Sequence, residues 1–215
     1  MTTASRKKIS IQSARLSNNG GGIPAAVLPV VRLLNYHYKI ILATFEAPED
    51  PIECEAVQIQ GNHLNHRKII CRLEWFVPQI VHTHGLWSPF SQAALDLRKK
   101  FASKLVISPH GMLDPWALKK SRIKKAIALG WFEKKHLNSA SVIHALNKEE
   151  ACSIRRIGVR TPIAIVPNGV HQSTGENLPK PVYMDKPCLL FLGRLTPKKG
   201  VSELIQACAR FSLKV

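Results

Sequence analysis

Short apolar runs alternate with segments of helical periodicity along most of this chain. The apolar runs predict a weak strand at Ile9–Ile11 and further strands at 39–45, 56–59, 80–85, 104–111, 141–146 and 163–170. The periodic segments between them predict helices at 25–35, 67–76, 90–100 and from Lys148 onwards. Pro29 is expected to kink the first helix or to shift its start. Strands that alternate with helices form a parallel, doubly wound sheet, so we predict an α/β fold.

Ligands of such sheets bind beyond the carboxyl ends of the strands, and small or polar residues lie at several of these ends. The positions concerned are His84, Gly85, His110, Gly111, Asn168 and Gly169. Three more glycines, Gly20, Gly21 and Gly22, follow the first strand and precede Pro24, which suits the first turn of a helix. We expect these positions to surround one cleft. The alternatives are a plain flexible turn at the three glycines and a His110 that is bonded to local backbone.

His82 and His84 lie two residues apart on a predicted strand and therefore point to the same face of the sheet. This spacing would suit two metal ligands. No carboxylate or cysteine lies nearby in the sequence, so we expect no metal site and assign both histidines an ordinary role near the cleft.

Residues 171–187 are mostly polar with several prolines, which predicts a linker between two domains, 1–170 and 188–215. The second domain would begin with a short buried strand at Leu189–Leu192, followed by a loop and by a helix that begins at Gly200. A domain usually needs at least about 50 residues, so 188–215 would be only the first β-α unit of a second domain.

The loop of this unit is suited to an anion, because the start of a helix presents backbone N–H groups to a phosphate. Arg194 and Lys199 stand five residues apart across the loop, with Gly193 and Gly200 beside them. Both basic side chains could reach one diphosphate, Arg194 as a planar fork and Lys199 as a point charge. The alternative is that both are solvated loop charges.

Five stretches together resemble GT-B glycosyltransferases of family 4, the glycosyl transferase group 1 type. They are NNGGGIPAAV (18–27), HTHGLWSPF (82–90), SPHGMLDPWAL (108–118), VPNGV (166–170) and CLLFLGRLTPKKG (188–200). They follow the order of the family and span most of the chain. The resemblance implies that 1–170 is a Rossmann-like, acceptor-side domain and that 188–215 is the start of a donor-binding domain.

The resemblance also implies a function, the retaining transfer of a sugar from a nucleotide-sugar donor to a hydroxyl acceptor without a metal or cofactor. Arg194 and Lys199 would stabilise the charge that develops on the leaving diphosphate. His110 would hydrogen bond a hydroxyl at the donor sugar or acceptor, which makes these three residues the catalytic candidates. The leaving phosphate itself can take the acceptor proton. Enzymes of this kind often act on lipid-linked acceptors.

Family members carry a downstream E-x7-E motif that contacts the donor, and this sequence lacks it. We therefore expect an incomplete, truncated enzyme with little or no activity alone, or one half of a split enzyme that a complementing chain completes. A non-catalytic interaction subunit is the alternative function.

The net charge of +17 predicts attraction to polyanions, that is, to nucleic acid, an anionic membrane or phosphorylated substrates. Nucleic acid is disfavoured, because no zinc-finger, RNP or helix-turn-helix pattern is present. Residues 116–137 carry seven Lys or Arg and one Glu, with Ile123, Ile127 and Trp131 spaced four apart. This pattern suits a helix on an anionic membrane surface. The alternative is an ordinary helix whose apolar stripe packs on the sheet.

No apolar run of about 18 residues predicts a membrane span, and the basic start without an apolar segment predicts no signal peptide. The five cysteines form no C-x-x-C pair, which predicts reduced thiols rather than a disulfide framework or a zinc ribbon. We therefore expect a cytoplasmic protein, peripheral on the inner face of the membrane where 116–137 docks.

Overall fold

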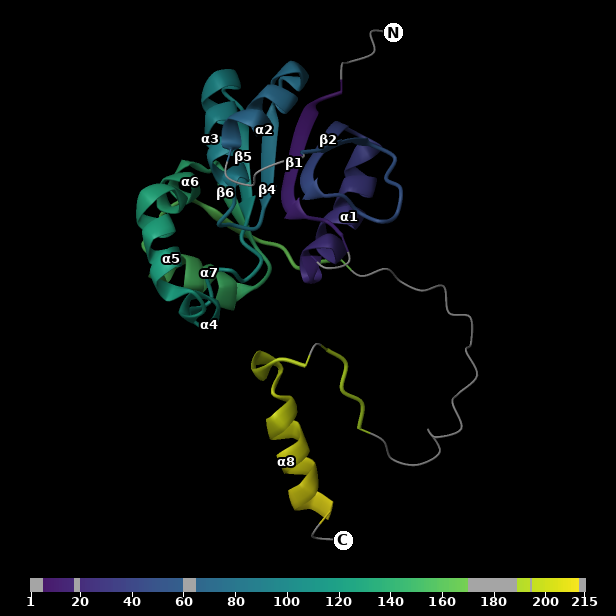
Figure 1. The fold of residues 1–215 in the computed structure, drawn as a ribbon, viewed down its shortest axis with the longest axis vertical. Helices are drawn as coiled ribbons and strands as arrows, with labels where there is room; N and C mark the ends of the chain where they lie inside the picture. Colours follow the sequence, from purple (N-terminus) through teal and green to yellow (C-terminus); the bar gives the residue numbers. More distant parts are fainter. Residues whose placement is uncertain (1–5, 18–19, 60–64, 170–188, 194, 213–215) are drawn as a thin grey trace. The chain divides into compact units, whose positions relative to one another are not determined.

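The computed structural model describes residues 6–17, 20–59, 65–169, 189–193 and 195–212. The chain divides into two compact units, residues 1–169 and residues 170–215. The first unit contains a sheet with its helices, and the second contains one labelled helix, α8 (Figure 1). None of the helices among these residues is both long and apolar enough to cross a membrane.

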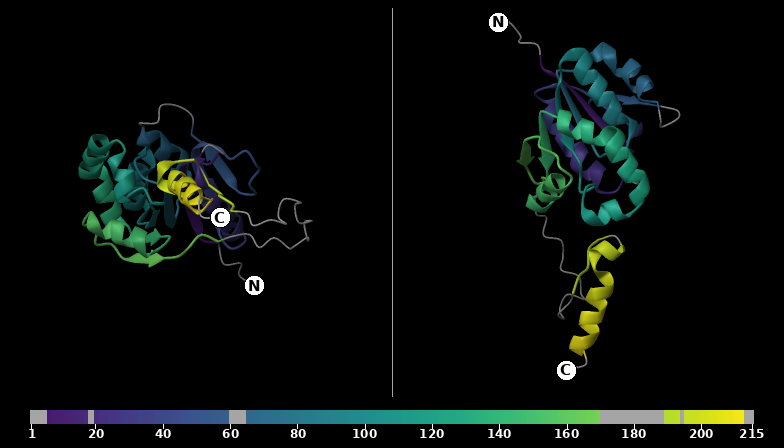
Figure 2. Two further views of the ribbon diagram at one scale, coloured as in Figure 1. Left: turned by 90° about the horizontal axis from the view of Figure 1, so that it is seen from below. Right: turned by 90° about the vertical axis from the view of Figure 1, so that its left-hand side faces the viewer.

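The first unit is built on a seven-stranded sheet in which all neighbouring strands are parallel (Figure 2). The strand order is β3-β2-β1-β4-β5-β6-β7. The strands are β1 (Lys8–Arg15), β2 (Lys39–Glu46), β3 (Glu55–Gln58), β4 (Ile80–His84), β5 (Lys104–Ser108), β6 (Val142–Ala145) and β7 (Ile163–Ile165). The predicted α/β fold with a parallel, doubly wound sheet is confirmed.

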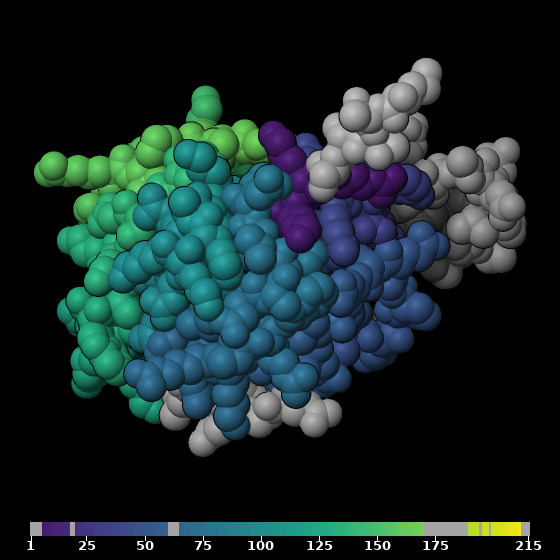
Figure 3. All heavy atoms as spheres, turned by 90° about the horizontal axis from the view of Figure 1, so that it is seen from above, coloured from purple at the N-terminus to yellow at the C-terminus, as the bar shows by residue number. Residues whose placement is uncertain are grey.

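Strand β1 lies inside the sheet between β2 and β4, although its apolar pattern is weak. Polar residues alternate with its isoleucines, and two of them, Ser10 and Gln12, are fully buried. The Gln12 side-chain amide donates to the Ser10 hydroxyl at 3.2 Å, so the two polar groups partly satisfy each other inside the core. In the space-filling view of Figure 3, the purple start of the chain is flanked by blue segments and by teal and green ones.

Most helices cover one face of the sheet, for a topological reason. The connections from β3 to β4 and onwards to β7 all move in the same direction along the sheet, and right-handed crossovers then place their helices on one side. These helices include α2 (His66–Leu73), α3 (Pro89–Phe101), α6 (Lys134–Ser139) and α7 (Lys148–Arg156), with a 3-10 turn at Glu74–Phe76. They share one core cluster with residues of the strands such as Val81, Leu105, Ile107 and Ile143.

Helix α1 (Gly22–Asn35) lies on the opposite face, because the connection from β1 to β2 runs in the other direction. Val27 and Val31 pack there against Ile9 and Ile11 in a second core cluster. The helix begins before Pro24 and continues through Pro29, so the expected shift of its start to a later residue is not observed. Among the described residues, α1 is the only helix in this cluster, and the same face of β4 to β7 is left open beside it.

Residues 115–139, here called the basic segment, form a series of short helices at one edge of the first unit (Figure 1). It consists of α4 (Pro115–Lys119), α5 (Arg122–Ala128), a π-helical turn at Leu129–Glu133, and α6. The π-helical turn adds a residue to the helical repeat and so changes which side chains face the core. Glu133 is fully buried while Trp131, two residues earlier, is 76% exposed.

The second unit contains a 3-10 turn at Pro197–Lys199 and α8 (Val201–Ser212). The expected strand at Leu189–Leu192 is not formed, so only the helical half of the predicted β-α unit is present. A strand needs a neighbouring strand to pair its backbone groups, and the described part of this unit holds no other strand. Leu190 and Leu192 are accordingly 75% and 92% exposed.

Candidate functional site

A pocket of about 460 Å³ lies on the open face of the sheet, between α1 and the carboxyl-terminal parts of strands β4 to β7. Its volume falls in the roughly 300–1,000 Å³ range that is usual for small-molecule sites. Most of the lining is apolar, and four imidazole rings and the Asn168 amide supply its polar side chains. The lining residues are Ala26, Pro29, Val30, Leu33, His82, His84, Val106, His110, Val142, His144, Ala164, Val166, Pro167, Asn168 and Gly169.

The parallel register explains why three of the histidines meet. His82 lies opposite Val106 on β5, and Val106 lies opposite Val142 on β6, so the alternate residues His82, His84 and His144 point to the same face. His110 enters the same pocket from the loop after β5. The site is thus assembled from three strand ends that are far apart in the sequence.

A hydrogen-bonded chain links His82 to His144 through Ser108. The His144 Nε2 atom lies 2.8 Å from the Val166 carbonyl oxygen, so this nitrogen carries the proton and donates. The Nδ1 atom of the same ring then accepts from the Ser108 hydroxyl at 2.8 Å. Ser108 in turn accepts from His82 Nε2, also at 2.8 Å. One backbone carbonyl therefore sets the direction of every hydrogen bond in the chain from His82 to His144.

His84 and His110 form a second pair, with His84 Nδ1 at 3.0 Å from His110 Nε2. The two rings are stacked at a centroid separation of 5.3 Å, and the His84 ring lies 4.0 Å from that of His82. The Nε2 atom of His84 is buried without a hydrogen-bond partner among the described residues. An unsatisfied buried polar atom costs about 1–3 kcal/mol of stability, so the packing around the His84 ring must offset this cost.

Three of the imidazoles, those of His82, His84 and His110, have lowered pKa values and are therefore neutral at neutral pH. Burial lowers the pKa of His82 to about 3, with a further contribution from the neighbouring His144 and His110. Burial, together with the neighbouring His144, also lowers the pKa of His110 to about 4. The pKa of His84 lies well below its ordinary value for the same reasons. A neutral imidazole both donates and accepts a hydrogen bond, which suits it to recognise a hydroxyl group.

The loop that carries His110 is held by a buried carboxylate on α7. Glu150 Oε1 accepts from the backbone N–H of Gly111 at 2.6 Å, and Oε2 accepts from that of Leu146 at 2.8 Å. His110 has a φ of 54° and Gly111 a φ of 70°, both in the left-handed region. Such a conformation costs a non-glycine residue of order 1–3 kcal/mol, so Glu150 acts to hold His110 in its position.

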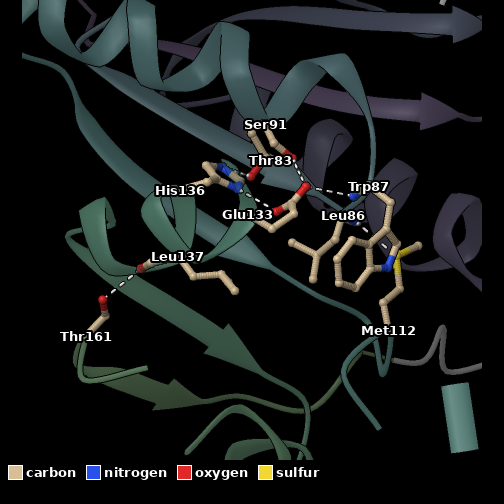
Figure 4. A network of polar contacts seen from close by, with 9 residues as sticks. All are labelled: Thr83, Leu86, Trp87, Ser91, Met112, Glu133, His136, Leu137 and Thr161. Carbon is tan, nitrogen blue, oxygen red and sulfur yellow. Dashed lines mark hydrogen bonds and ion pairs between the residues drawn. The ribbon is translucent and has the colours of Figure 1, made fainter. Parts of the chain in front are cut away.

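A second buried carboxylate holds the loop after β4 (Figure 4). Glu133 Oε1 accepts from the Trp87 backbone N–H at 2.8 Å and from the Ser91 hydroxyl at 2.6 Å. Its Oε2 atom pairs with His136 Nδ1 at 3.2 Å, and both of these side chains are fully buried. Trp87 also has a left-handed φ, 63°. Both loops that flank the pocket are therefore anchored by carboxylates that come later in the sequence.

The structure brings together several of the predicted positions. His84, His110, Asn168 and Gly169 all line the pocket, and Gly85 and Gly111 directly follow two of its histidines. The glycines Gly20, Gly21 and Gly22 do not line it. Gly20 and Gly21 precede α1 and Gly22 is its first residue, whereas α1 lines the pocket through its later residues.

The predicted diphosphate loop belongs to the second unit. Lys199 is exposed, and Gly200, with a φ of 67°, ends the 3-10 turn just before α8. Gly193 is described and exposed, whereas Arg194 lies outside the described residues. The role of these four residues in binding a diphosphate stays a prediction.

Sequence reasoning missed His144, Ser108 and the two anchoring carboxylates. His144 and Ser108 could have been found, because each stands on the open face of a predicted strand two residues after a valine that lines the same pocket. Glu133 and Glu150 give no such signal, since each looks like a solvated helix residue in the sequence. Among the described residues, no three His, Cys, Asp or Glu side chains are arranged to hold a metal ion.

Sequence comparison then identifies the family. The family model for the glycosyl transferase 4-like domain matches residues 19–169, which is most of the chain. The chain belongs to this family, and the resemblance to GT-B family 4 is confirmed. No curated protein matches the chain in sequence.

Comparison of structures supports the fold. The sucrose-phosphate synthase of Thermosynechococcus elongatus superposes with a TM-score of 0.61 at 17% identity, over 77% of this chain and 49% of that one. The Anabaena protein Alr3699/HepE, in complex with UDP-glucose, gives a TM-score of 0.51 at 16% identity, over 76% of this chain and 44% of that one. The chain thus spans about half the length of these two proteins.

Proposed function

We propose that the first unit is the acceptor-side half of a retaining glycosyltransferase that moves a sugar from a nucleotide-diphosphate donor to a hydroxyl group. The observation that carries the proposal is the pocket of histidines at the carboxyl ends of β4, β5 and β6, in a chain that belongs to the glycosyl transferase 4-like family. Parallel sheets bind ligands at this edge. A mixed apolar and hydrogen-bonding lining suits the two kinds of surface on a sugar ring.

In the proposed reaction His110 is the residue nearest the chemistry in this unit. Its neutral imidazole hydrogen bonds a hydroxyl of the donor sugar or acceptor, and Glu150 holds it there through Gly111. Arg194 and Lys199 stabilise the charge that develops on the diphosphate as the glycosidic bond breaks. The departing phosphate takes the proton of the acceptor hydroxyl, so no further base and no cofactor is required. The acceptor we propose is a lipid-linked saccharide or a growing glycan.

The chain spans 49% of one structural relative and 44% of another, so about half of each of those proteins has no aligned counterpart in it. We therefore propose that catalysis requires a second half, supplied by further sequence or by a complementing chain. The alternative, a non-catalytic interaction subunit, rests on the same partial coverage of the two structural relatives. The domain limits 1–170, 171–187 and 188–215 stay predictions.

Acceptor recognition is tested through the histidine rings themselves. We would record the imidazole C2–H resonances of the full chain while adding a panel of methyl glycosides and disaccharides. The proposal expects shifts of the His84 and His110 resonances for at least one saccharide, and their loss in His110→Ala. His37→Ala, at an exposed histidine outside the pocket, is the matched control. If no saccharide shifts these resonances, the acceptor-side role is wrong.

Turnover is the second test, with radiolabelled UDP-, GDP- and ADP-sugars and a membrane lipid extract as acceptor. The proposal expects negligible transfer by the 215-residue chain alone. Robust transfer by the purified chain would contradict the need for a second half. It would leave the acceptor assignment standing, because the NMR titration measures that separately.

A further inference from the structure

The basic segment presents large apolar side chains to solvent, which the fold does not require. Ile123 is 76% exposed, Ile127 62%, Trp131 76% and Trp116 48%. All four lie on α4, α5 or the π-helical turn. The alternative in which this stripe packs on the sheet is therefore wrong, since Leu137 and Glu133 make the buried contacts of the segment instead.

The charge around these side chains is of one sign. Between residues 115 and 139 the only acidic residue is Glu133, and it is fully buried against Ser91 and His136. The exposed basic residues of the segment are Lys119, Lys120, Arg122, Lys124, Lys134 and Lys135. The solvent-facing side of the segment therefore has positive charge interleaved with isoleucine and tryptophan.

We propose that residues 115–135, here called the basic-aromatic surface, dock on a bilayer of anionic phospholipid. Lysines that surround the apolar side chains match the headgroup region, where their stems lie along the acyl boundary and their ammonium groups meet phosphates. Tryptophan and isoleucine enter the boundary itself. The cores of protein interfaces are depleted in lysine, and nucleic acid offers no apolar phase for isoleucine, so neither suits this composition as well. The inference does not depend on sugar transfer.

The test is cosedimentation of the full chain with vesicles of phosphatidylcholine and with vesicles that contain phosphatidylglycerol and phosphatidylcholine in equal parts. We expect binding to the anionic vesicles that weakens as salt is raised, and little binding to the neutral ones. Tryptophan fluorescence should shift to the blue and be quenched by brominated lipid. Both effects should decrease in Trp131→Phe.

Matched variants separate a local surface from general attraction by the net charge. The double variant Lys124→Gln/Lys135→Gln should weaken binding by about 25-fold, at about fivefold for each basic residue near the membrane. Lys68→Gln/Lys99→Gln removes the same charge from exposed positions on α2 and α3, and it should change binding by less than about threefold. Ile123→Gln/Ile127→Gln should also abolish most binding, while Phe211→Gln, at an equally exposed residue of α8, should not.

Four outcomes would overturn the proposal. Equal weakening by both lysine pairs would mean that net charge alone attracts the vesicles. Full binding by Ile123→Gln/Ile127→Gln would mean that no apolar insertion occurs. Concentration-dependent self-association without lipid, removed by the isoleucine changes, would show that a second copy of the chain covers the surface. A gel shift with generic DNA that needs Lys124 and Lys135 would instead assign the surface to nucleic acid.

Discussion

Glu133 offers the sharpest test of how the site is held together. Its carboxylate is fully buried and has three partners, the Trp87 backbone N–H, the Ser91 hydroxyl and His136. Glu133→Ala removes all three interactions at once. It leaves a buried N–H, a hydroxyl and an imidazole without their acceptor, and it leaves a cavity where the side chain was.

The cost can be bounded from these contacts. Removing one member of a buried pair destabilises a protein by about 3–5 kcal/mol, which agrees with about 1–3 kcal/mol for each buried group left unsatisfied. Glu133→Gln keeps one oxygen for Trp87 and Ser91, and it loses only the charge and the contact to His136. We expect it to cost about 1–2 kcal/mol. Since whole domains are stable by about 5–15 kcal/mol, Glu133→Ala should remove a large part of the stability of the first unit.

The assay is urea unfolding at neutral pH, followed by far-ultraviolet circular dichroism and by tryptophan fluorescence. Asp50→Ala, at an exposed carboxylate, serves as the control and should change the free energy of unfolding by less than about 0.5 kcal/mol. If Glu133→Ala costs less than about 1 kcal/mol, or no more than Glu133→Gln, then the carboxylate does not anchor the loop as argued.

Three further predictions concern the pocket and its loops. The free energy of unfolding should fall as the pH drops from 6.5 towards 4. The reason is that His82 and His110 have folded-state pKa values of about 3 and about 4, below their ordinary 6.5, so the unfolded chain binds protons at a higher pH than the folded chain does. Urea midpoints measured across this pH range test the prediction, and His82→Gln should make them depend less on pH. Gly20→Ala should lower the free energy of unfolding by about 1–3 kcal/mol, because its Cβ would lie 2.7 Å from Pro24 Cγ and 2.9 Å from the Arg15 carbonyl oxygen. In the same assay Gly22→Ala is the control, since its Cβ would meet nothing within 4 Å and should not destabilise α1. Glu150→Gln should broaden or shift the His110 C2–H resonance while changing the urea midpoint less than Glu150→Ala does, and an unaltered resonance would contradict its positioning role.

The fold could be predicted well from the sequence because its signals are local. Apolar runs such as Lys39–Phe45 mark buried parallel strands, and the predicted doubly wound sheet is confirmed. The expected strand at Leu189–Leu192 is missing because the same apolar signal needs a partner strand, which a local pattern does not report. The helix predicted at 25–35 is present as α1 and continues through Pro29, where packing of Val27 and Val31 outweighs one lost hydrogen bond.

The site was only partly predictable, because it depends on register and burial. Glycine and histidine at strand ends pointed to His84 and His110, but the sequence does not show which strands are neighbours. Once β4, β5 and β6 are known to lie side by side, His82, Ser108 and His144 follow from alternation. The carboxylates stay hidden even then, since Glu133 lies in a π-helical turn and Glu150 on α7, outside the strands whose alternation places the histidines.

That turn also decides how the basic-aromatic surface can be tested. The same five residues, Leu129–Glu133, present Trp131 to solvent and Glu133 to the loop after β4. Deleting the segment would therefore release the Trp87 backbone N–H and the Ser91 hydroxyl, and a loss of vesicle binding would then report damage to the loops of the pocket. Side-chain changes on the exposed flank leave the carboxylate contacts in place. Loss of binding in such variants, with an unchanged urea midpoint, therefore separates the surface from the fold that carries it.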